Sequence, residues 1–128
     1  MDDTVHEKIF GGGNCTGISK TLSLVGDKWS VLTIMLLSER PRRFNDIKRT
    51  IGNITQRMLT LTLRGLEREG LVKRTVYPTT PPQVEYELTA LGRSLQEPIK
   101  ALGRWTWMNQ EQLEQHRASY DARLGAQG

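Results

Sequence analysis

The stretch NITQRMLTLTLRGLEREG, residues 53–70, has the apolar spacing of an amphipathic helix. At about 100° per residue, Leu59, Leu63 and Leu66 lie on one side of that helix, which predicts that this side packs on a core. The opposite side carries a different set of side chains: Arg57, Leu61, Arg64 and Arg68. Such a back face is either solvated or in contact with a partner, and the neighbouring sequence bears on that choice.

Capping residues mark where this helix and its neighbours begin and end. Thr55 is a favourable N-cap, and Gly70 stands where a left-handed C-terminal cap is expected. Asp27 is an N-cap for an earlier helix that contains the apolar run VLTIMLL. Because that earlier helix is apolar nearly all round, we expect it to be the central core helix. Upstream of residue 53 the pattern predicts three helices, over about residues 16–25, 28–37 and 44–51.

The residue composition of the chain changes after Gly70. The runs LVKRTVY (71–77) and QVEYELT (83–89) are β-branched and aromatic, and the Pro-rich segment PTTPP joins them, which predicts a β-hairpin. Thr89 then caps another helix, and Pro98 fits the first turn of a last helix. That last helix carries an apolar stripe formed by Ile99, Leu102, Trp105 and Met108.

The order of these elements predicts a mainly α fold with a small β-hairpin. A helix-turn-helix followed directly by a hairpin is the winged helix-turn-helix arrangement. We expect one domain over residues 15–118, a flexible N-terminal segment over 1–14 and a flexible C-terminal tail over 119–128. No apolar run reaches membrane length, and the acidic, Gly-rich N-terminus is not typical of a signal peptide, so we expect a cytoplasmic protein with no membrane partner.

Basic residues are concentrated in the middle of the chain. The net charge is +4, but residues 40–77 hold ten Lys and Arg against three acidic residues, which gives +7. The rest of the chain holds eight basic and eleven acidic residues, which gives −3. A basic block in an otherwise acidic protein favours a polyanion-binding surface, although a solvated helix face is the alternative.

The first turns of the helix that begins after Thr55 are candidates for DNA contact. The second helix of a helix-turn-helix inserts its N-terminal turns into the major groove, where Arg can bond guanine, Gln can bond adenine and methyl groups can meet thymine. Basic side chains before the short helix and on the first strand are placed to reach phosphates. The candidate DNA-binding residues are Arg42, Arg43, Thr55, Gln56, Arg57, Thr60, Leu61, Arg64, Lys73 and Arg74. The alternative is that these are ordinary surface residues, with Leu61 a lone exposed leucine.

Four motifs in the right order and spacing carry a resemblance to a known family. They are Cys15 followed by TLSLVGDKWS, then RRFNDI, ITQRMLTLTLRGLEREGLVKR and VEYELTALGRSL. On these motifs, from about Cys15 to Trp105, the chain resembles the HxlR-type family of winged helix-turn-helix transcriptional regulators. The resemblance implies a regulator, more often a repressor, that binds double-stranded DNA at a pseudo-palindromic operator. The chain departs from the family at Gln83, where an Arg is common, and at Gly65, where a polar or charged residue is usual.

The resemblance also implies how the protein assembles. Family members are homodimers that associate through their N- and C-terminal helices. Carried over to this sequence, the implied interface residues are Ile18, Leu22, Ile99, Leu102, Trp105 and Met108.

Cys15 is the single cysteine of the chain and a candidate sensor. It follows Asn14, a suitable N-cap, so its sulfur is expected in the first turn of a helix, where the helix dipole favours the reactive thiolate. Some family members use a cysteine at this position to detect quinones, aldehydes or oxidants, which implies a small electrophile or oxidant as the effector. The alternative is that Cys15 is a small apolar residue at a helix start.

Other functions have less support from the sequence. There is no nucleophile–base pair, paired carboxylate or phosphate loop, so we expect no enzyme activity and no cofactor. His6, Cys15 and His116 are too widely spaced to predict a metal site. Two alternatives stay open: a ligand-responsive regulator with a pocket at the dimer interface, lined by Trp29, Trp105 or Met108, and a winged-helix protein-interaction module.

Overall fold

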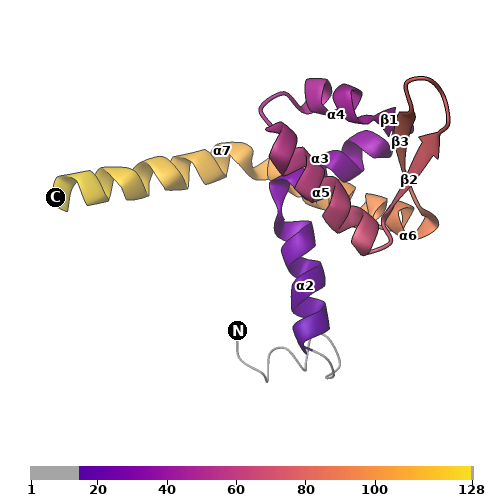
Figure 1. Cartoon of the computed structure of the whole chain (residues 1–128). Coiled ribbons are helices and arrows are strands. Elements are labelled where there is room, and N and C mark those ends of the chain that lie inside the picture. The colour runs from indigo at the N-terminus through magenta and orange to yellow at the C-terminus, as the bar shows by residue number, and fades with distance from the viewer. Residues whose placement is uncertain (1–14, 128) are drawn as a thin grey trace. The chain divides into compact units, whose positions relative to one another are not determined.

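The computed structural model describes residues 15–127 of the 128-residue chain. The chain divides into two compact units, residues 1–94 and residues 95–128. Within the described part of the first unit, α2 (Cys15–Gly26), α3 (Lys28–Leu37), α4 (Phe44–Ile51) and α5 (Gln56–Arg68) precede a small sheet and the short helix α6 (Ala90–Arg93), as Figure 1 shows. The expected flexible segment over residues 1–14 lies outside the described residues.

The helix α3 begins at the predicted cap. Asp27 Oδ2 accepts hydrogen bonds from the Ser30 backbone N (3.2 Å) and from Ser30 Oγ (2.9 Å). The helix contacts α2, α4, α5 and β3, which confirms its central place. It is not buried all round, however, because its neighbours cover only the side formed by Ser30, Thr33, Ile34 and Leu37. Leu32 and Met35 are each 43% exposed on the other side.

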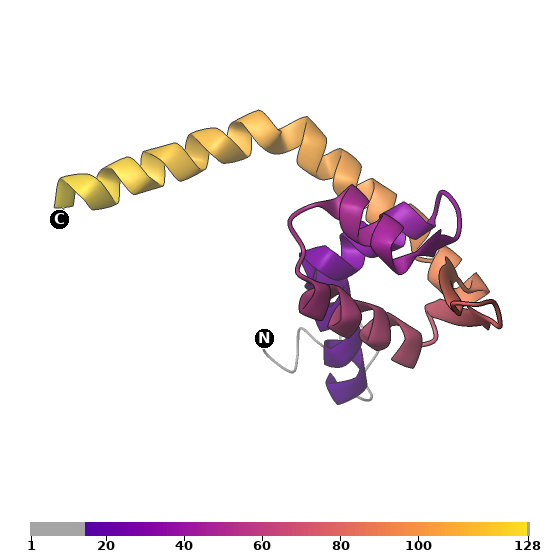
Figure 2. The same cartoon turned by 45° about the horizontal axis from the view of Figure 1, so that its top comes forward.

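The helices α4 and α5 form the predicted helix-turn-helix, visible in Figures 1 and 2. The turn begins at Gly52, whose φ of 92° favours glycine, and Ile54 is buried within it. Thr55 then caps α5 as predicted, since its Oγ1 accepts a hydrogen bond from the Met58 backbone N at 3.1 Å. The turn and the cap together fix where the first residues of α5 lie.

A glycine with left-handed backbone conformation ends α5 and directs the chain into the β-hairpin, which forms the wing of the fold. Gly70 has φ 76°, its N donates to Glu67 O at 3.0 Å, and the Leu71 N donates to Leu66 O at 2.9 Å. This pair of bonds is the Schellman motif, and it confirms the predicted C-terminal cap. The wing strand β2 therefore begins two residues after this glycine.

Two strands of the predicted hairpin and one further strand form the sheet. β2 (Val72–Tyr77) pairs antiparallel with β3 (Gln83–Leu88), and residues 78–82 connect them. A two-residue strand, β1 (Arg42–Arg43), pairs with the other edge of β3, which gives the order β1-β3-β2. The sequence did not predict β1, because two residues are too few to show a period-2 pattern. The fold of this unit is a winged helix.

Thr89 joins the end of α5 to the start of α6. Its Oγ1 donates to Gly70 O at 2.6 Å and accepts from the Gly92 N at 3.1 Å, which confirms the predicted cap. Its backbone N donates to Leu71 O at 3.0 Å. The segment that leads from α5 into the wing is thus bonded to α6.

The second unit is one long helix, α7 (Gln96–Gln127), with Pro98 in its first turn. The helix continues past residue 118, so the prediction of a flexible tail from residue 119 onward is wrong for residues 119–127, which are helical. No helix among the described residues is both long and apolar enough to span a membrane.

Candidate nucleic-acid interface

The two sides of α5 differ as the spacing predicted. Leu59, Leu63 and Leu66 are at most 2% exposed and anchor the helix on the core. The opposite side is exposed along its whole length: Arg57, Leu61, Arg64 and Arg68. Leu61 is 50% exposed, an apolar side chain between arginines on this side of the helix.

In the first turns of α5, some side chains are exposed, and others form hydrogen bonds with the backbone of the same helix. The Thr55 hydroxyl caps the helix, and the Thr60 hydroxyl donates to the Gln56 backbone O at 2.9 Å. The Thr55 hydroxyl can still donate a hydrogen bond to a partner, whereas the Thr60 hydroxyl can only accept one in addition; both side chains also offer a methyl group. Gln56 and Arg57 are exposed, and Arg57 forms no ion pair within the part of the chain that the structure describes.

The wing places Arg74 and Lys73 on different faces of the sheet. In the register of β2 and β3, Arg74 pairs with Tyr86 and Lys73 with Glu87. Since successive residues of a strand point to opposite faces, only one of the two can face α5. That residue is Arg74, which lines a hollow with α5 side chains, whereas Lys73 lies opposite an acidic residue on the other face.

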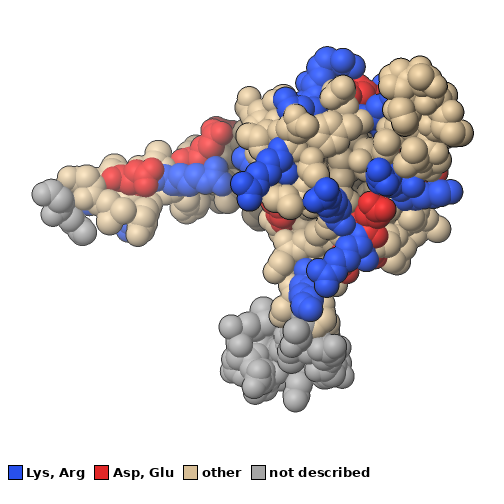
Figure 3. All heavy atoms as spheres, in the orientation of Figure 1, with Lys and Arg blue, Asp and Glu red and all other residues tan. Residues whose placement is uncertain are grey.

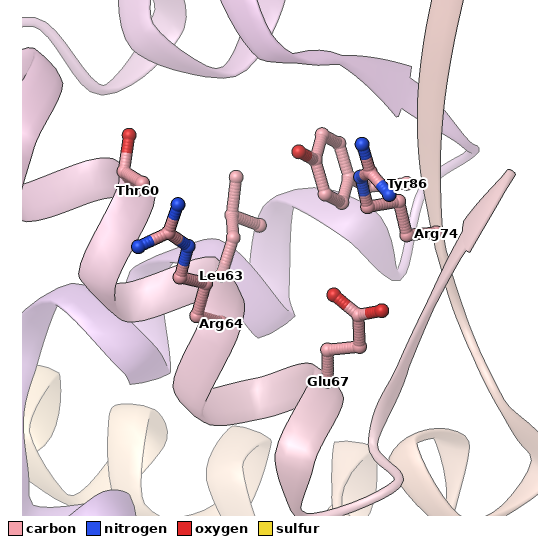
Figure 4. A pocket seen from close by; sticks show the side chains of 6 residues that line it. All are labelled: Thr60, Leu63, Arg64, Glu67, Arg74 and Tyr86. Carbon is pink, nitrogen blue, oxygen red and sulfur yellow. The ribbon is translucent and has the colours of Figure 1, made fainter. Parts of the chain in front are cut away.

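The hollow between α5 and the sheet has a volume of about 310 Å³. Figure 4 shows it: Thr60, Arg64 and Glu67 come from α5, Arg74 and Tyr86 stand across from them, and Leu63 lies between. Two of the predicted basic contacts, Arg64 and Arg74, thus share one concave surface. The hollow also holds the carboxylate of Glu67.

Tyr77 and Glu85 interact near the tip of the wing. The Tyr77 hydroxyl donates to Glu85 Oε1 at 3.3 Å. The negative charge of Glu85 is the main reason that the pKa of the Tyr77 phenol lies above its ordinary value. The phenol therefore stays neutral, and acts as a hydrogen-bond donor, throughout the physiological pH range.

Arg42 differs from its neighbour Arg43 and from its predicted role. Arg42 is only 7% exposed and pairs with Glu39 and with Asp46, whereas Arg43 is exposed. A buried guanidinium with two carboxylate partners is not placed to reach a phosphate, so we do not retain Arg42 among the candidate contacts. The sequence could not separate the two arginines because the strand that buries one of them was not predicted.

Basic side chains gather on one face of the first unit. In Figure 3 they lie over α4, α5 and β2, with few acidic side chains among them. Arg40 and Arg49 belong to the basic block but were not singled out from the sequence, and their side chains are 60% and 77% exposed. The sequence does contain a feature that draws attention to Arg49: it follows Asp46 by one turn of α4, a spacing at which an ion pair is expected.

The predicted dimer residues fall into two groups by exposure. Ile99 is 3% exposed in the single chain, so it has almost no surface left for a partner. Leu102, Trp105 and Met108 are 53%, 54% and 79% exposed and form an apolar stripe on α7. On α2, Ile18 is half-buried, whereas Leu22 is exposed.

Cys15 is the first residue of α2, as predicted, but its side chain and Asn14 lie outside the described part of the structure. Two lysines follow Cys15 in the first helices: Lys20 is exposed, and Lys28 places its Nζ 4.4 Å from the centre of the Trp29 ring. Within residues 15–127, no group of three or more His, Cys, Asp or Glu is arranged to hold a metal ion.

Comparison with known proteins identifies relatives of this chain. The family model of HxlR-like helix-turn-helix proteins matches residues 24–114. The HTH-type transcriptional regulator YybR of Bacillus subtilis (strain 168) is 41% identical over 99 residues, which cover 77% of this chain and 79% of YybR. The HTH-type transcriptional regulator YtfH of Escherichia coli (strain K12) is 40% identical over 90 residues, 70% of this chain and 71% of YtfH.

The solved structures of two regulators are also similar to this chain. The reduced form of the redox regulator HypR superimposes with a TM-score of 0.72 at 40% identity and covers 78% of this chain and 99% of its own. The reduced form of the transcriptional regulator YodB from B. subtilis has a TM-score of 0.65 at 37% identity, over 73% of this chain and 92% of its own.

Proposed function

This chain belongs to the HxlR-like helix-turn-helix family of transcriptional regulators, and we propose that it is a repressor that binds a pseudo-palindromic operator as a homodimer. Its family makes it a DNA-binding regulator and not an enzyme. The observation that carries the proposal is the exposed first part of α5, where Gln56, Arg57 and Leu61 face away from the core. A repressor acts where the DNA lies, so we place the protein in the cytoplasm.

The length and side chains of α5 suit the major groove. Thirteen residues give a helix of about 20 Å, and the groove, about 12 Å wide, admits one α-helix. Arg57 can donate two hydrogen bonds to guanine, Gln56 can bond adenine, and Leu61 can meet a thymine methyl group. Arg64 and Arg74 lie on the two sides of the hollow, and we expect them to contact the phosphates that border the groove.

The apolar stripe of α7 supports the homodimer. Leu102, Trp105 and Met108 expose more than half of their surface in the single chain, and large exposed apolar patches mark interaction sites. A second copy would cover the stripe through a two-fold axis. Two recognition helices related in this way would address half-sites about one helical turn apart, roughly 34–36 Å, or a multiple of that.

Electrophoretic mobility shifts test the proposed function. We expect one retarded species with the promoter region next to the gene, at a protein concentration where random DNA of equal length stays free. The specific complex should weaken steeply between 50 and 200 mM salt, because several Lys and Arg side chains release counterions from phosphates. Absence of any specific complex at low salt would refute the proposal and favour the protein-interaction alternative.

Cys15 is the proposed sensor of this regulator. The support is the similarity to the redox regulator HypR and the position of Cys15 at the N-terminus of α2, where the helix dipole favours the thiolate. A thiolate there could add to a quinone carbon or be oxidised by a peroxide or diamide. Because no second cysteine exists in the chain, a disulfide would need the dimer mate or a small thiol.

The sensor proposal predicts that quinone or diamide treatment releases wild-type protein from its operator and that a reductant reverses the effect of diamide. The Cys15→Ser variant should bind the operator normally and resist both reagents. Shift assays before and after treatment, with mass spectrometry of the modified thiol, measure this. Equal release of wild type and Cys15→Ser would show that the cysteine is structural.

A further inference from the structure

One carboxylate on α4 is shared by three arginines. Asp46 Oδ2 lies 3.4 Å from Arg40 Nη1 and 3.3 Å from Arg42 Nη1, and its Oδ1 lies 3.4 Å from Arg49 Nη2. Glu39 supplies a second carboxylate, but its ion pair is with Arg42. The cluster therefore holds three positive and two negative charges and keeps an excess of one positive charge.

The three arginines of this cluster have different surroundings. Arg42 is buried in the strand β1, so its pairs with Asp46 and Glu39 connect β1 to α4 and to the segment that follows α3. The side chains of Arg40 and Arg49 are 60% and 77% exposed. Each of these two guanidiniums uses one nitrogen on Asp46, and a guanidinium has five N–H donors, so most of their donors face solvent.

We propose that Arg40 and Arg49 contact backbone phosphates of the operator and that Asp46 is the positioning residue that holds them. This inference rests on the proposed DNA-binding function. In a helix-turn-helix the first helix crosses the DNA backbone, and α4 is that helix here. Two guanidiniums held by one carboxylate lose less side-chain freedom on binding than two free arginines would, which favours phosphate contact.

The two exposed arginines give the first test. Arg40→Gln and Arg49→Gln should each weaken binding to operator and random DNA by the same factor, since phosphates carry no sequence information. Each substitution should also lower the slope of log K against log salt by about 0.9 per protomer. Arg123→Gln, which removes the same charge from α7, is the control and should change neither quantity. Unchanged slopes for both arginine variants would overturn the proposal.

Asp46→Asn gives a second test, because a positioning role and a simple charge effect predict opposite changes in DNA affinity. If the carboxylate only neutralised the arginines, its removal would make the surface more basic and raise DNA affinity. If it positions them, affinity should fall despite the added charge, and Arg49→Gln should cost less in the Asp46→Asn background than in wild type. Tighter binding by a folded Asp46→Asn protein would overturn the positioning role.

Loss of Asp46 could also disturb the buried Arg42, so the melting temperature of each variant must accompany its binding curve. The exposed Arg40 and Arg49 variants do not share this problem and test the phosphate contacts even if Asp46→Asn unfolds.

Failure of this inference is distinct from failure of the proposed function. In the first case wild type still binds its operator and the slopes of the two arginine variants are unchanged, whereas in the second wild type forms no specific complex.

Discussion

Replacing Gly92 by alanine is expected to destabilise the winged-helix unit by about 3 kcal/mol, at the upper end of what overpacking costs. A Cβ at this position would lie 2.1 Å from Leu71 O and 3.1 Å from Leu88 Cδ2. The nearer atom belongs to the backbone and cannot rotate away. It also accepts the hydrogen bond from the Thr89 N, so moving it would disturb the cap of α6 as well.

The position of Gly92 connects this stability prediction to DNA binding. Leu71 follows Gly70 at the end of α5, and its N closes the helix on Leu66 O. A shift of Leu71 would therefore change how the wing leaves the recognition helix, and we expect operator affinity to fall together with stability.

Urea or thermal unfolding followed by circular dichroism measures the effect of Gly92→Ala. Two glycine-to-alanine controls come from the same chain. An added Cβ at Gly103 meets nothing within 4 Å, and one at Gly65 meets only Leu24 Cδ1 at 3.9 Å. Both lie inside helices, where alanine is favoured over glycine by about 1 kcal/mol, so both variants should be at least as stable as wild type. A Gly92→Ala protein with wild-type stability would contradict the close approach.

Features that depend on a few neighbouring residues were predictable from the sequence. The caps Asp27, Thr55, Gly70 and Thr89 all act where the sequence placed them, because a cap is a local hydrogen-bonding requirement. The core side of α5 followed from the helical period in the same way. These local signals were enough to predict the winged-helix order of elements.

Features that depend on pairing between distant segments were not predictable in the same way. β1 exists only because Arg42 and Arg43 meet Tyr86 and Glu85 across the sheet, and this pairing determines which arginine is buried. Which side of α3 is exposed depends on where its neighbours end, and this cannot be predicted from the apolar composition of the helix. The separation of Lys73 from Arg74 is different, since strand alternation alone could have revealed it.

Arg57→Ala is expected to weaken operator binding by about 1–3 kcal/mol per half-site, which corresponds to roughly 5- to 150-fold in affinity. Arg57 is the second residue of α5, it is exposed, and it has no ion-pair partner within residues 15–127. Its guanidinium is therefore free to donate two hydrogen bonds to the O6 and N7 of a guanine. Loss of that contact should reduce the preference for operator over random DNA and leave the salt dependence nearly unchanged.

Arg68→Ala is the matched control for this prediction. Arg68 lies on the same exposed side of α5, but it is the last residue of the helix, about 16 Å further along its axis. The N-terminal turns are the part that enters the groove, so Arg68→Ala should have little effect on specificity. Titrations of both variants against operator and random DNA separate base contact from charge. If Arg57→Ala lowers both affinities equally and lowers the salt slope by about 0.9, then Arg57 contacts a phosphate and sequence recognition belongs to Gln56 and Leu61.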